Sequence, residues 1–159
     1  MKGNVMTLSE AVKSCFCKYI TISGRAGRAE FWWFALVFGL LAYLSAFVLY
    51  NSVVLNGESI PLWGWILFLA ALVSIPPYVS VIVRRLHDGN HSGHYVWIAY
   101  LVLAIAGYLY SMNAGASEMM HYVIVFVIVA VALLNVVLLW WVIKPGDKGG
   151  NKFGAVPKK

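Results

Sequence analysis

The chain has 159 residues, of which 62% are hydrophobic and 11% are charged, and its mean hydropathy is +0.79. Roughly a quarter of the residues in a soluble globular domain are charged, so this composition excludes that class and indicates an integral membrane protein. The formal net charge of +6 does not indicate a nucleic-acid ligand here, because in a membrane protein the basic residues show which side of the membrane each loop occupies.

The N-terminal segment, residues 1–30, is predicted to be cytoplasmic and to contain an amphipathic helix that lies on the inner leaflet. Apolar side chains recur in it at helical spacing, beside lysines: Leu8, Val12, Phe16 and Tyr19. Thr7, followed three residues later by Glu10, forms a capping-box pattern that predicts the start of this helix. Cys15 and Cys17 are too few ligands for a metal site, and in the cytoplasm they are expected to stay reduced.

Four long apolar runs follow, and none of them contains a formally charged residue. We predict that they are transmembrane helices, at 31–50, 62–83, 95–110 and 121–143. A spanning helix needs about 20 residues, so the third run must extend into neighbours such as His94 and Ser111. The chain is therefore expected to be an all-α membrane protein with a four-helix transmembrane domain, residues 31–143.

The basic residues are confined to three of the segments outside these runs. The 12 lysines and arginines are Lys2, Lys13, Lys18, Arg25, Arg28, Arg84, Arg85, Lys144, Lys148, Lys152, Lys158 and Lys159. The two remaining loops, 51–61 and 111–120, contain none of them and carry Glu58 and Glu118. Because lysine and arginine collect on the cytoplasmic side, both termini and the 84–94 loop are predicted to be cytoplasmic, which requires an even number of spans.

Several residues in the runs and in the tail predict local structure. Small residues share one face of the first run, which would let another helix approach closely: Ala35, Gly39, Ala42 and Ala46. Pro76-Pro77 is expected to kink the second run. Asn135 in the fourth run is expected to hydrogen-bond to a neighbouring helix, because an unpaired amide in hydrocarbon is costly. The tail, residues 144–159, is rich in Gly, Pro and Lys and is predicted to be a turn-rich, partly mobile cytoplasmic extension.

Two polar segments border the runs on the side predicted to be cytoplasmic, SGRAGRAEFWW at 23–33 and RRLHDGNHSGHYVW at 84–97. Three blocks in the chain carry a resemblance to known proteins: Gly24-Arg25-Ala26 with Arg28, Glu30, Phe31 and Trp32; Arg84-Arg85-Leu86-His87-Asp88 with Ser92-Gly93; and Gly150-Asn151-Lys152-Phe153-Gly154. In these blocks the chain resembles the domain of unknown function 805 family, the YhaH/YhaI-like small bacterial inner-membrane proteins. The resemblance covers nearly the whole chain and implies a four-helix protein of the bacterial inner membrane, without an established activity. The chain departs from the family pattern at Asn90, which also tolerates a left-handed turn, and at His91, His94 and Tyr95.

The histidines of the second polar segment raise the question of a metal site. His87, His91 and His94 are spaced by four and three positions, which on a continuous helix could supply ligands. The glycines and serine between them argue against a continuous helix, and only His87 and the adjacent Asp88 belong to the family-like motif. We therefore expect no metal ion and no cofactor, and interpret the three imidazoles as solvated or interfacial.

The candidate site is a polar cluster at the predicted cytoplasmic surface, together with three residues of the tail. It consists of Arg25, Arg28, Glu30, Arg84, Arg85, His87, Asp88, Ser92 and Gly93, with Asn151, Phe153 and Gly154. As a structural network, Asp88 would cap or pair with Arg25, Arg28 or Arg85, and Glu30 with another arginine, which would hold the two helix hairpins together. As a binding site, the four arginines would attract anionic lipid headgroups. As a catalytic site, His87 would act with Asp88 as its orienting partner.

Three functional hypotheses follow from these interpretations. The first is a non-enzymatic inner-membrane protein whose cluster organises the bundle and contacts anionic phospholipid or a protein partner, which includes a second copy of the chain. It is favoured because no nucleophile motif and no glycine-rich phosphate loop accompany the cluster. The second is a small oligomeric channel or transporter, against which stands the lack of charged residues within the runs. The third is an enzyme that modifies lipid headgroups with His87 and Asp88.

Overall fold

The computed structural model describes residues 6–112 and 118–157, and within these ranges it contains helices, turns and loops but no strand. The helices are α1 (Leu8–Cys17), α2 (Arg28–Leu49), the π-helix η1 (Tyr50–Leu55), α3 (Leu62–Val73), α4 (Ile75–Asp88), α5 (His94–Met112) and α6 (Glu118–Ile143). The predicted all-helical class is therefore confirmed. Lys2, Lys158, Lys159, the loop 113–117 and the side chains of Ser111 and Glu118 lie outside the described residues.

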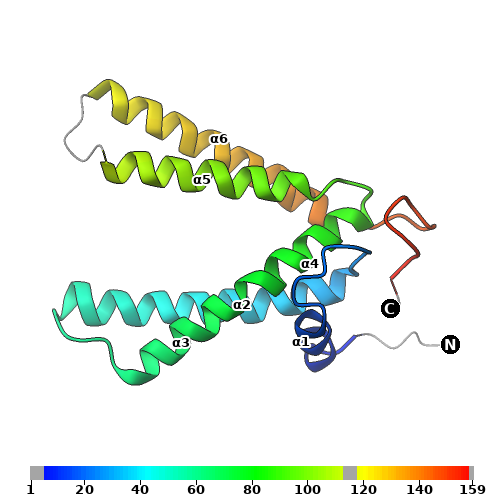
Figure 1. Ribbon diagram of the computed structural model, residues 1–159, viewed down its shortest axis with the longest axis horizontal. Coiled ribbons are helices and arrows are strands. Elements are labelled where there is room, and N and C mark those ends of the chain that lie inside the picture. Colours follow the sequence, from blue (N-terminus) through cyan, green and yellow to red (C-terminus); the bar gives the residue numbers. More distant parts are fainter. Residues whose placement is uncertain (1–5, 113–117, 158–159) are drawn as a thin grey trace.

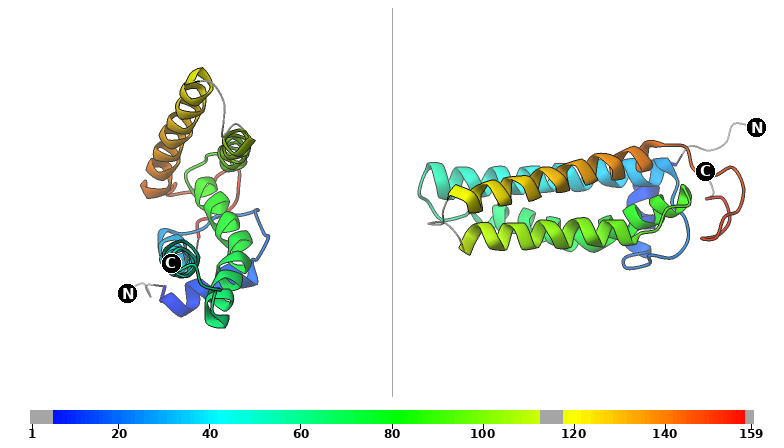
Figure 2. Two further views of the ribbon diagram at one scale, coloured as in Figure 1. Left: turned by 90° about the vertical axis from the view of Figure 1, so that its left-hand side faces the viewer. Right: turned by 90° about the horizontal axis from the view of Figure 1, so that it is seen from above.

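The helices form two pairs that diverge from a common polar end. In the first pair α2 packs along α3, in the second α5 packs along α6, and the second pair contacts the first through α4 (Figure 1). The helix α1, the loop 89–93 and the tail lie together at the end where the pairs meet, which we call the polar end (Figure 1). Two further views show that the helices of both pairs extend from this end in the same direction (Figure 2).

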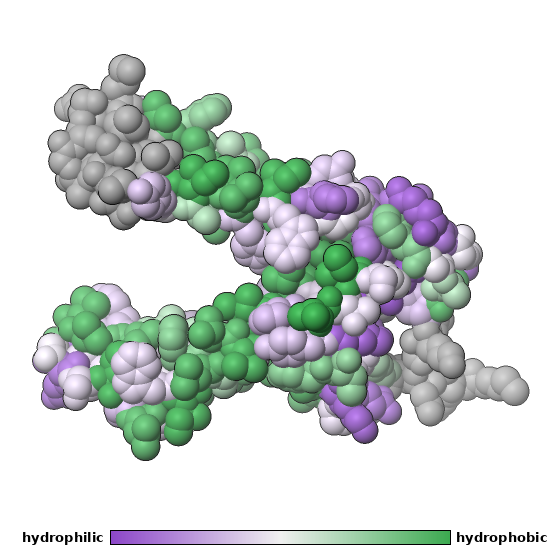
Figure 3. All heavy atoms as spheres, in the orientation of Figure 1, coloured by the Kyte–Doolittle hydropathy of each residue, from purple (hydrophilic) through white to green (hydrophobic). Residues whose placement is uncertain are grey.

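In the part of the chain that the structure describes, three helical stretches are long and apolar enough to cross a membrane: Arg28–Leu55, Leu62–Asp88 and Val125–Ile143. They contain the first, second and fourth predicted spans, or most of them, and agree with the predicted membrane class. The third predicted span coincides with α5, whose described apolar portion, His94–Ile105, is shorter than such a stretch. Apolar side chains cover the diverging helices, whereas hydrophilic residues gather at the polar end (Figure 3).

The second predicted span is interrupted, as its proline pair indicates. Helix α3 ends at Val73, and Ser74, with φ −83° and ψ −8°, separates it from α4. Pro76 and Pro77 lie in the first turn of α4, where a missing backbone N–H breaks no helical hydrogen bond. The hydroxyl of Ser74 donates to the carbonyl oxygen of Ala70 at 2.8 Å. The predicted break in the helix is confirmed, and it lies at Ser74, two residues before the first proline.

Helix α1 begins with the predicted capping box and packs against α2. Thr7 Oγ1 accepts a hydrogen bond from the backbone N–H of Glu10, and the Glu10 carboxylate accepts one from the backbone N–H of Thr7. The side of α1 that faces the protein carries the fully buried Ala11 and Cys15. Leu8 and Phe16 of the predicted apolar face remain about 40% exposed, so this face is only partly covered within the chain.

The structure contradicts one packing prediction at Gly39 and another at Asn135. The small-residue face of α2 receives no other helix at Gly39, where an added Cβ would meet nothing within 4 Å. The close approach is made by Gly64 of α3, where an added Cβ would lie 2.8 Å from Cγ1 of Val48 on α2. The amide of Asn135 donates to the carbonyl oxygen of Val131, one turn back on its own helix, at 2.8 Å, instead of reaching a neighbouring helix.

Candidate functional site

The motif Arg84–Asp88 is helical and buried, whereas the sequence suggested a polar loop from position 84 onwards. These residues complete the last turn of α4, and Arg84 and Arg85 are each only 1% exposed. The turn that follows ends the helix: the N–H of His91 donates to the carbonyl of Leu86 at 2.9 Å, and Asn90 has φ +60°. Asn90 thus occupies the left-handed conformation that asparagine tolerates. The polar loop begins only at Gly89.

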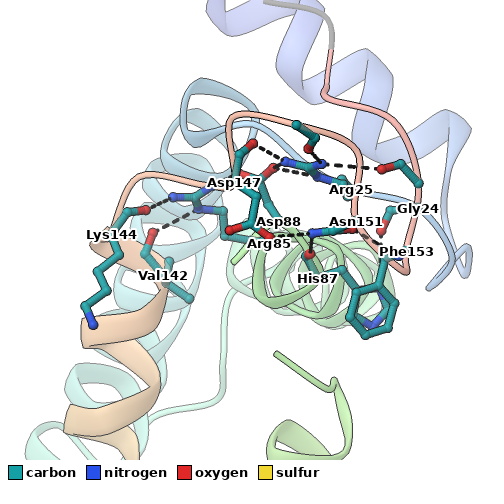
Figure 4. Close-up of polar contacts among 12 residues, drawn as sticks. Gly24, Arg25, Arg85, His87, Asp88, Val142, Lys144, Asp147, Asn151 and Phe153 are labelled. Atoms are coloured by element: carbon teal, nitrogen blue, oxygen red, sulfur yellow. Dashed lines mark hydrogen bonds and ion pairs between the residues drawn. The ribbon is translucent and has the colours of Figure 1, made fainter. Parts of the chain in front are cut away.

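Asp88 lies between two arginine side chains. Its Oδ1 accepts a hydrogen bond from Nε of Arg25 at 2.9 Å, and its Oδ2 accepts one from Nη1 of Arg85 (Figure 4). Arg25 precedes α2, so this contact joins the start of the first predicted span to the end of the second. We call Arg25, Arg85 and Asp88 the arginine–aspartate cluster. The predicted pairing of Asp88 with Arg25 and Arg85 is confirmed, whereas Arg28 is exposed and has no ion pair within the described ranges.

Backbone carbonyls from the C-terminal part of the chain surround both guanidinium groups (Figure 4). Arg25 donates through Nη1 to Gly149 O at 2.7 Å and through Nη2 to Asp147 O at 2.7 Å. Arg85 donates through Nε to Val142 O at 2.9 Å, at the end of α6, and through Nη2 to Lys144 O. Backbone carbonyl oxygens and one carboxylate therefore accept the hydrogen bonds that the two arginines donate.

The tail folds back over the end of α4 and contains the predicted turns, within 148–155, whereas its predicted partial mobility stays a prediction. Asn151 donates through Nδ2 to the carbonyl oxygen of His87 at 2.9 Å. The ring of Phe153 stacks on the His87 imidazole with centroids 3.8 Å apart. Gly154 pairs with Asn151 in an isolated bridge, and its carbonyl accepts from Arg25 Nη1 at 3.3 Å. The three tail residues singled out in the sequence therefore all belong to this contact.

Gly146 allows the tail to pass close to Asp88. A Cβ at this position would collide with the Asp88 carboxylate, while the N–H of Asp147 donates to the Asp88 carbonyl at 2.9 Å. Any larger side chain would push the tail away from the cluster. Sequence reasoning missed Gly146 and Asp147, and the glycine-rich pattern GDKGGN was the one signal for so close an approach.

A second buried ion pair, Glu30 with Arg84, connects α1, α2 and α4. Arg84 Nη1 donates to Glu30 Oε1 at 2.8 Å, and Ser14 of α1 donates to the same oxygen at 2.9 Å. Lys18 Nζ lies 3.5 Å from this oxygen. Among the described residues, Nε and Nη2 of Arg84 have no hydrogen-bond partner, although the side chain is buried. The predicted pairing of Glu30 with an arginine is confirmed.

The three histidines have separate surroundings and do not converge. His87 Nδ1 lies 3.1 Å from the carbonyl oxygen of Gly24, and His91 stacks on Trp141 with centroids 4.1 Å apart. Burial lowers the pKa of the His91 imidazole, and the positive charge of Lys144 lowers it further. His87 and His91 are therefore half-buried and not fully solvated, and the alternative that they are interfacial stays a prediction. Within the described ranges no group of three histidine, cysteine or acidic residues is placed to hold a metal ion.

Ser92 and Gly93 shape the turn into α5 and stand apart from the arginine–aspartate cluster. Ser92 Oγ lies 2.6 Å from Nδ1 of His94 and accepts from the His94 N–H at 3.4 Å. Gly93 is buried, and an added Cβ would lie 2.5 Å from Cγ1 of Val83. These residues bring α5 close to α4.

The pairing of His87 with Asp88 that a catalytic role requires is not made. The Asp88 carboxylate faces two guanidinium groups, and the His87 ring is held by Gly24 and Phe153. In this arrangement Asp88 does not orient the imidazole for proton transfer.

Known proteins are similar to this chain over most of its length. A family model described as "Protein of unknown function (DUF805)" matches residues 19–155. The chain belongs to this family. It is similar to the inner membrane protein YhaI of Escherichia coli K12, at 26% identity over 140 residues that cover 88% of each chain, and equally to YhaI of Escherichia coli O157:H7. No solved structure matches.

The three blocks that resemble this family meet in space. Arg25 from the first, Asp88 from the second and Gly154 from the third lie within one network of hydrogen bonds (Figure 4). Segments far apart in the sequence of this family member therefore form one contact at the polar end.

Proposed function

We propose that this family member is a non-enzymatic, multi-pass protein of the bacterial inner membrane, and that its arginine–aspartate cluster organises the transmembrane bundle. One observation carries the proposal: Arg25 and Arg85 are buried, and they donate hydrogen bonds to Asp88 and to backbone carbonyls between Val142 and Gly154. Guanidinium groups occupied in this way hold segments together and leave few donors for a ligand phosphate.

The proposed topology has four spans and both termini in the cytoplasm. Helix α5 has 19 residues, about 28 Å at 1.5 Å per residue, which is close to the hydrocarbon thickness of a bilayer. The described basic residues of 6–28, of the end of α4 and of 144–157 belong to segments of the polar end, which supports a cytoplasmic position by the positive-inside rule. Helix α1 then lies on the inner leaflet, with the exposed Leu8 and Phe16 toward lipid.

Contact with anionic phospholipid falls to exposed basic residues and not to the buried arginines. Among the described residues, the exposed cations of the polar end are Lys13, Arg28, Lys144, Lys148 and Lys152. Each basic residue near a membrane surface contributes on the order of 1 kcal/mol of attraction to anionic lipid. The sequence suggested that four arginines contact lipid headgroups, and of these only the exposed Arg28 keeps that role in the proposal.

Vesicles of defined composition test the lipid part of the proposal. Thermal unfolding is compared in vesicles of phosphatidylcholine alone and in vesicles containing phosphatidylglycerol. The proposal predicts stabilisation by phosphatidylglycerol, and a smaller stabilisation for Lys144→Gln/Lys148→Gln/Lys152→Gln. Equal stability of the wild type in both kinds of vesicle contradicts the lipid contact.

A further inference from the structure

A cavity of about 120 Å³ lies between the two helix pairs. Phe31, Val96 and Val142 line it from the first turns of α2 and α5 and the last turn of α6, so it lies at the closed end of the opening between the pairs. The space-filling view shows this opening (Figure 3). An apolar cavity of about 150 Å³ is able to hold a benzene molecule, so this one has room for part of a hydrocarbon chain.

Three polar side chains also line the cavity: Tyr78, Tyr100 and Asn135. The recorded hydrogen bond of Asn135 stays within α6, and no hydrogen bond links either tyrosine hydroxyl to another described residue. Polar groups without partners are costly in the hydrocarbon region. The two hydroxyls and the amide can donate hydrogen bonds to an ester carbonyl, a group that glycerophospholipids carry.

Arg28 is the first residue of α2, about one turn before the cavity residue Phe31, and we infer from this that it lies near the rim of the cavity. It precedes Phe31 by three residues on α2, so the two side chains lie on the same face of the helix. Arg85, whose Nε donates to the carbonyl of the cavity residue Val142 at 2.9 Å, places a buried cation beside the cavity as well. Because Arg28 is exposed and has no ion pair among the described residues, its guanidinium is available to a phosphate.

The charge near this rim favours an anion. The buried arginines outnumber the buried carboxylates at the polar end, with Arg25, Arg84 and Arg85 against Glu30 and Asp88. Arg28 adds another positive charge. An anionic group beside Arg28 would offset this excess in a region of low dielectric constant, where charge interactions are strong.

We propose that this cavity binds one anionic phospholipid, with its phosphate at Arg28 and part of an acyl chain among Phe31, Ala99 and Leu138. The proposal rests on the proposed contact with anionic lipid and names one defined site for it. The apolar walls take the chain, the three polar side chains face the ester region, and the cation at the rim selects the negative headgroup.

Native mass spectrometry of the protein titrated with dioleoyl phosphatidylglycerol tests the site. Arg28→Gln removes the rim cation, and Ala99→Phe fills the cavity. Glu58→Gln and Ala104→Phe are controls, because both positions are exposed, lie outside the cavity and have no proposed contact with lipid. We expect the first bound lipid to dissociate at least tenfold more readily from Arg28→Gln and from Ala99→Phe, and equally from wild type and controls. If Ala99→Phe does not fold, Asn135→Leu takes its place, because it keeps the branched shape and the number of side-chain heavy atoms and removes the amide.

The outcomes separate this site from the broader proposal. Dihexanoyl phosphatidylglycerol, whose chains are short, is expected to bind at least tenfold more weakly than the dioleoyl lipid. If neither Arg28→Gln nor the cavity variant changes the affinity while phosphatidylglycerol is still preferred over phosphatidylcholine, the site is wrong and the general lipid contact stands. An effect of only one of the two variants also overturns the site, because it requires both parts. If the wild type does not distinguish the two lipids, both proposals fail.

Discussion

Arg25 and Asp88 are 63 positions apart in the sequence, and Nε of Arg25 donates to Oδ1 of Asp88 at 2.9 Å in a buried ion pair. The contact joins the segment before α2 to the last turn of α4. Carbonyls of the tail accept hydrogen bonds from the same guanidinium. The Asp88 carboxylate, by holding this guanidinium, therefore connects the segment before α2, the end of α4 and the tail. This connection leads to specific expectations for single substitutions.

Replacing Asp88 by asparagine should strongly destabilise the protein. The substitution leaves Arg25 and Arg85 buried without their shared anion, and losing one partner of a buried ion pair costs about 3–5 kcal/mol. Thermal unfolding in detergent micelles measures the effect. Glu58→Gln is the control, because it removes one negative charge at an exposed position far from the polar end. Similar unfolding temperatures for the two variants would show that Asp88 is dispensable.

The pair of Glu30 and Arg84 should behave differently when both partners are replaced. Glu30→Gln leaves the Arg84 charge buried and should cost about 3–5 kcal/mol, whereas exchanging both ions of a buried pair for uncharged residues is often nearly neutral. We therefore expect Glu30→Gln/Arg84→Met to be more stable than Glu30→Gln alone. A double-mutant cycle on the free energy of unfolding measures this difference. Additive effects of the two substitutions would exclude the coupling.

Two glycines of the tail provide a test of its close approach to Asp88. Gly146→Ala places a methyl group against the Asp88 carboxylate, whereas at Gly149 an added Cβ meets nothing within 4 Å. Overpacking of this kind costs about 1–3 kcal/mol, so Gly146→Ala should lower the unfolding temperature and Gly149→Ala should change it little. If both variants unfold like the wild type, the tail does not pass this close to α4.

The two cysteines of α1 should differ in reactivity. Cys15 is fully buried, and burial raises its pKa to about 11, with the negative charge of Glu30 acting in the same direction. The thiolate is the reactive form, so near neutral pH Cys15 stays protonated and unreactive, while Cys17 is exposed. We expect a maleimide to label the wild type once and Cys17→Ser not at all. Labelling of Cys17→Ser at pH 7.5 would contradict the packing of α1 on α2.

The same label tests the proposed topology. If α1 lies on the cytoplasmic side, a membrane-impermeant maleimide should react with Cys17 in inverted inner-membrane vesicles and not in intact spheroplasts. Reaction in spheroplasts would reverse the proposed orientation.

Much of the helical architecture could be predicted from composition and periodicity. Long apolar runs indicated the helices, Pro76-Pro77 indicated the kink, and Thr7 with Glu10 indicated the start of α1, because each signal acts within one or two helical turns. Long-range packing could not be predicted in this way. The face of small residues on α2 is open at Gly39, and the close approach between helices occurs at Gly64 instead. Which face of a helix meets a neighbour is determined by the folded chain and cannot be read from the spacing of small residues alone.

The residues of the site could be predicted from the sequence, but only some of the contacts among them could. Opposite charges near one surface indicated that Asp88 and Glu30 would pair with arginines, and they do. The sequence could not show that the arginines are buried, because their partners include backbone carbonyls such as Gly149 O and Asp147 O. Every residue has a backbone carbonyl, so the sequence does not indicate which carbonyls will accept hydrogen bonds from an arginine.

The most direct test of the cluster's role is the distance between the two parts that it joins. Spin labels on the native Cys17 of α1 and on Ile98→Cys of α5 report the position of the second helix pair relative to the first, by double electron–electron resonance. Both positions are exposed. We predict a narrow distance distribution in the wild type and in Glu58→Gln, and a broad one in Asp88→Asn. An unchanged narrow distribution in Asp88→Asn would contradict the claim that the arginine–aspartate cluster holds the two helix pairs together.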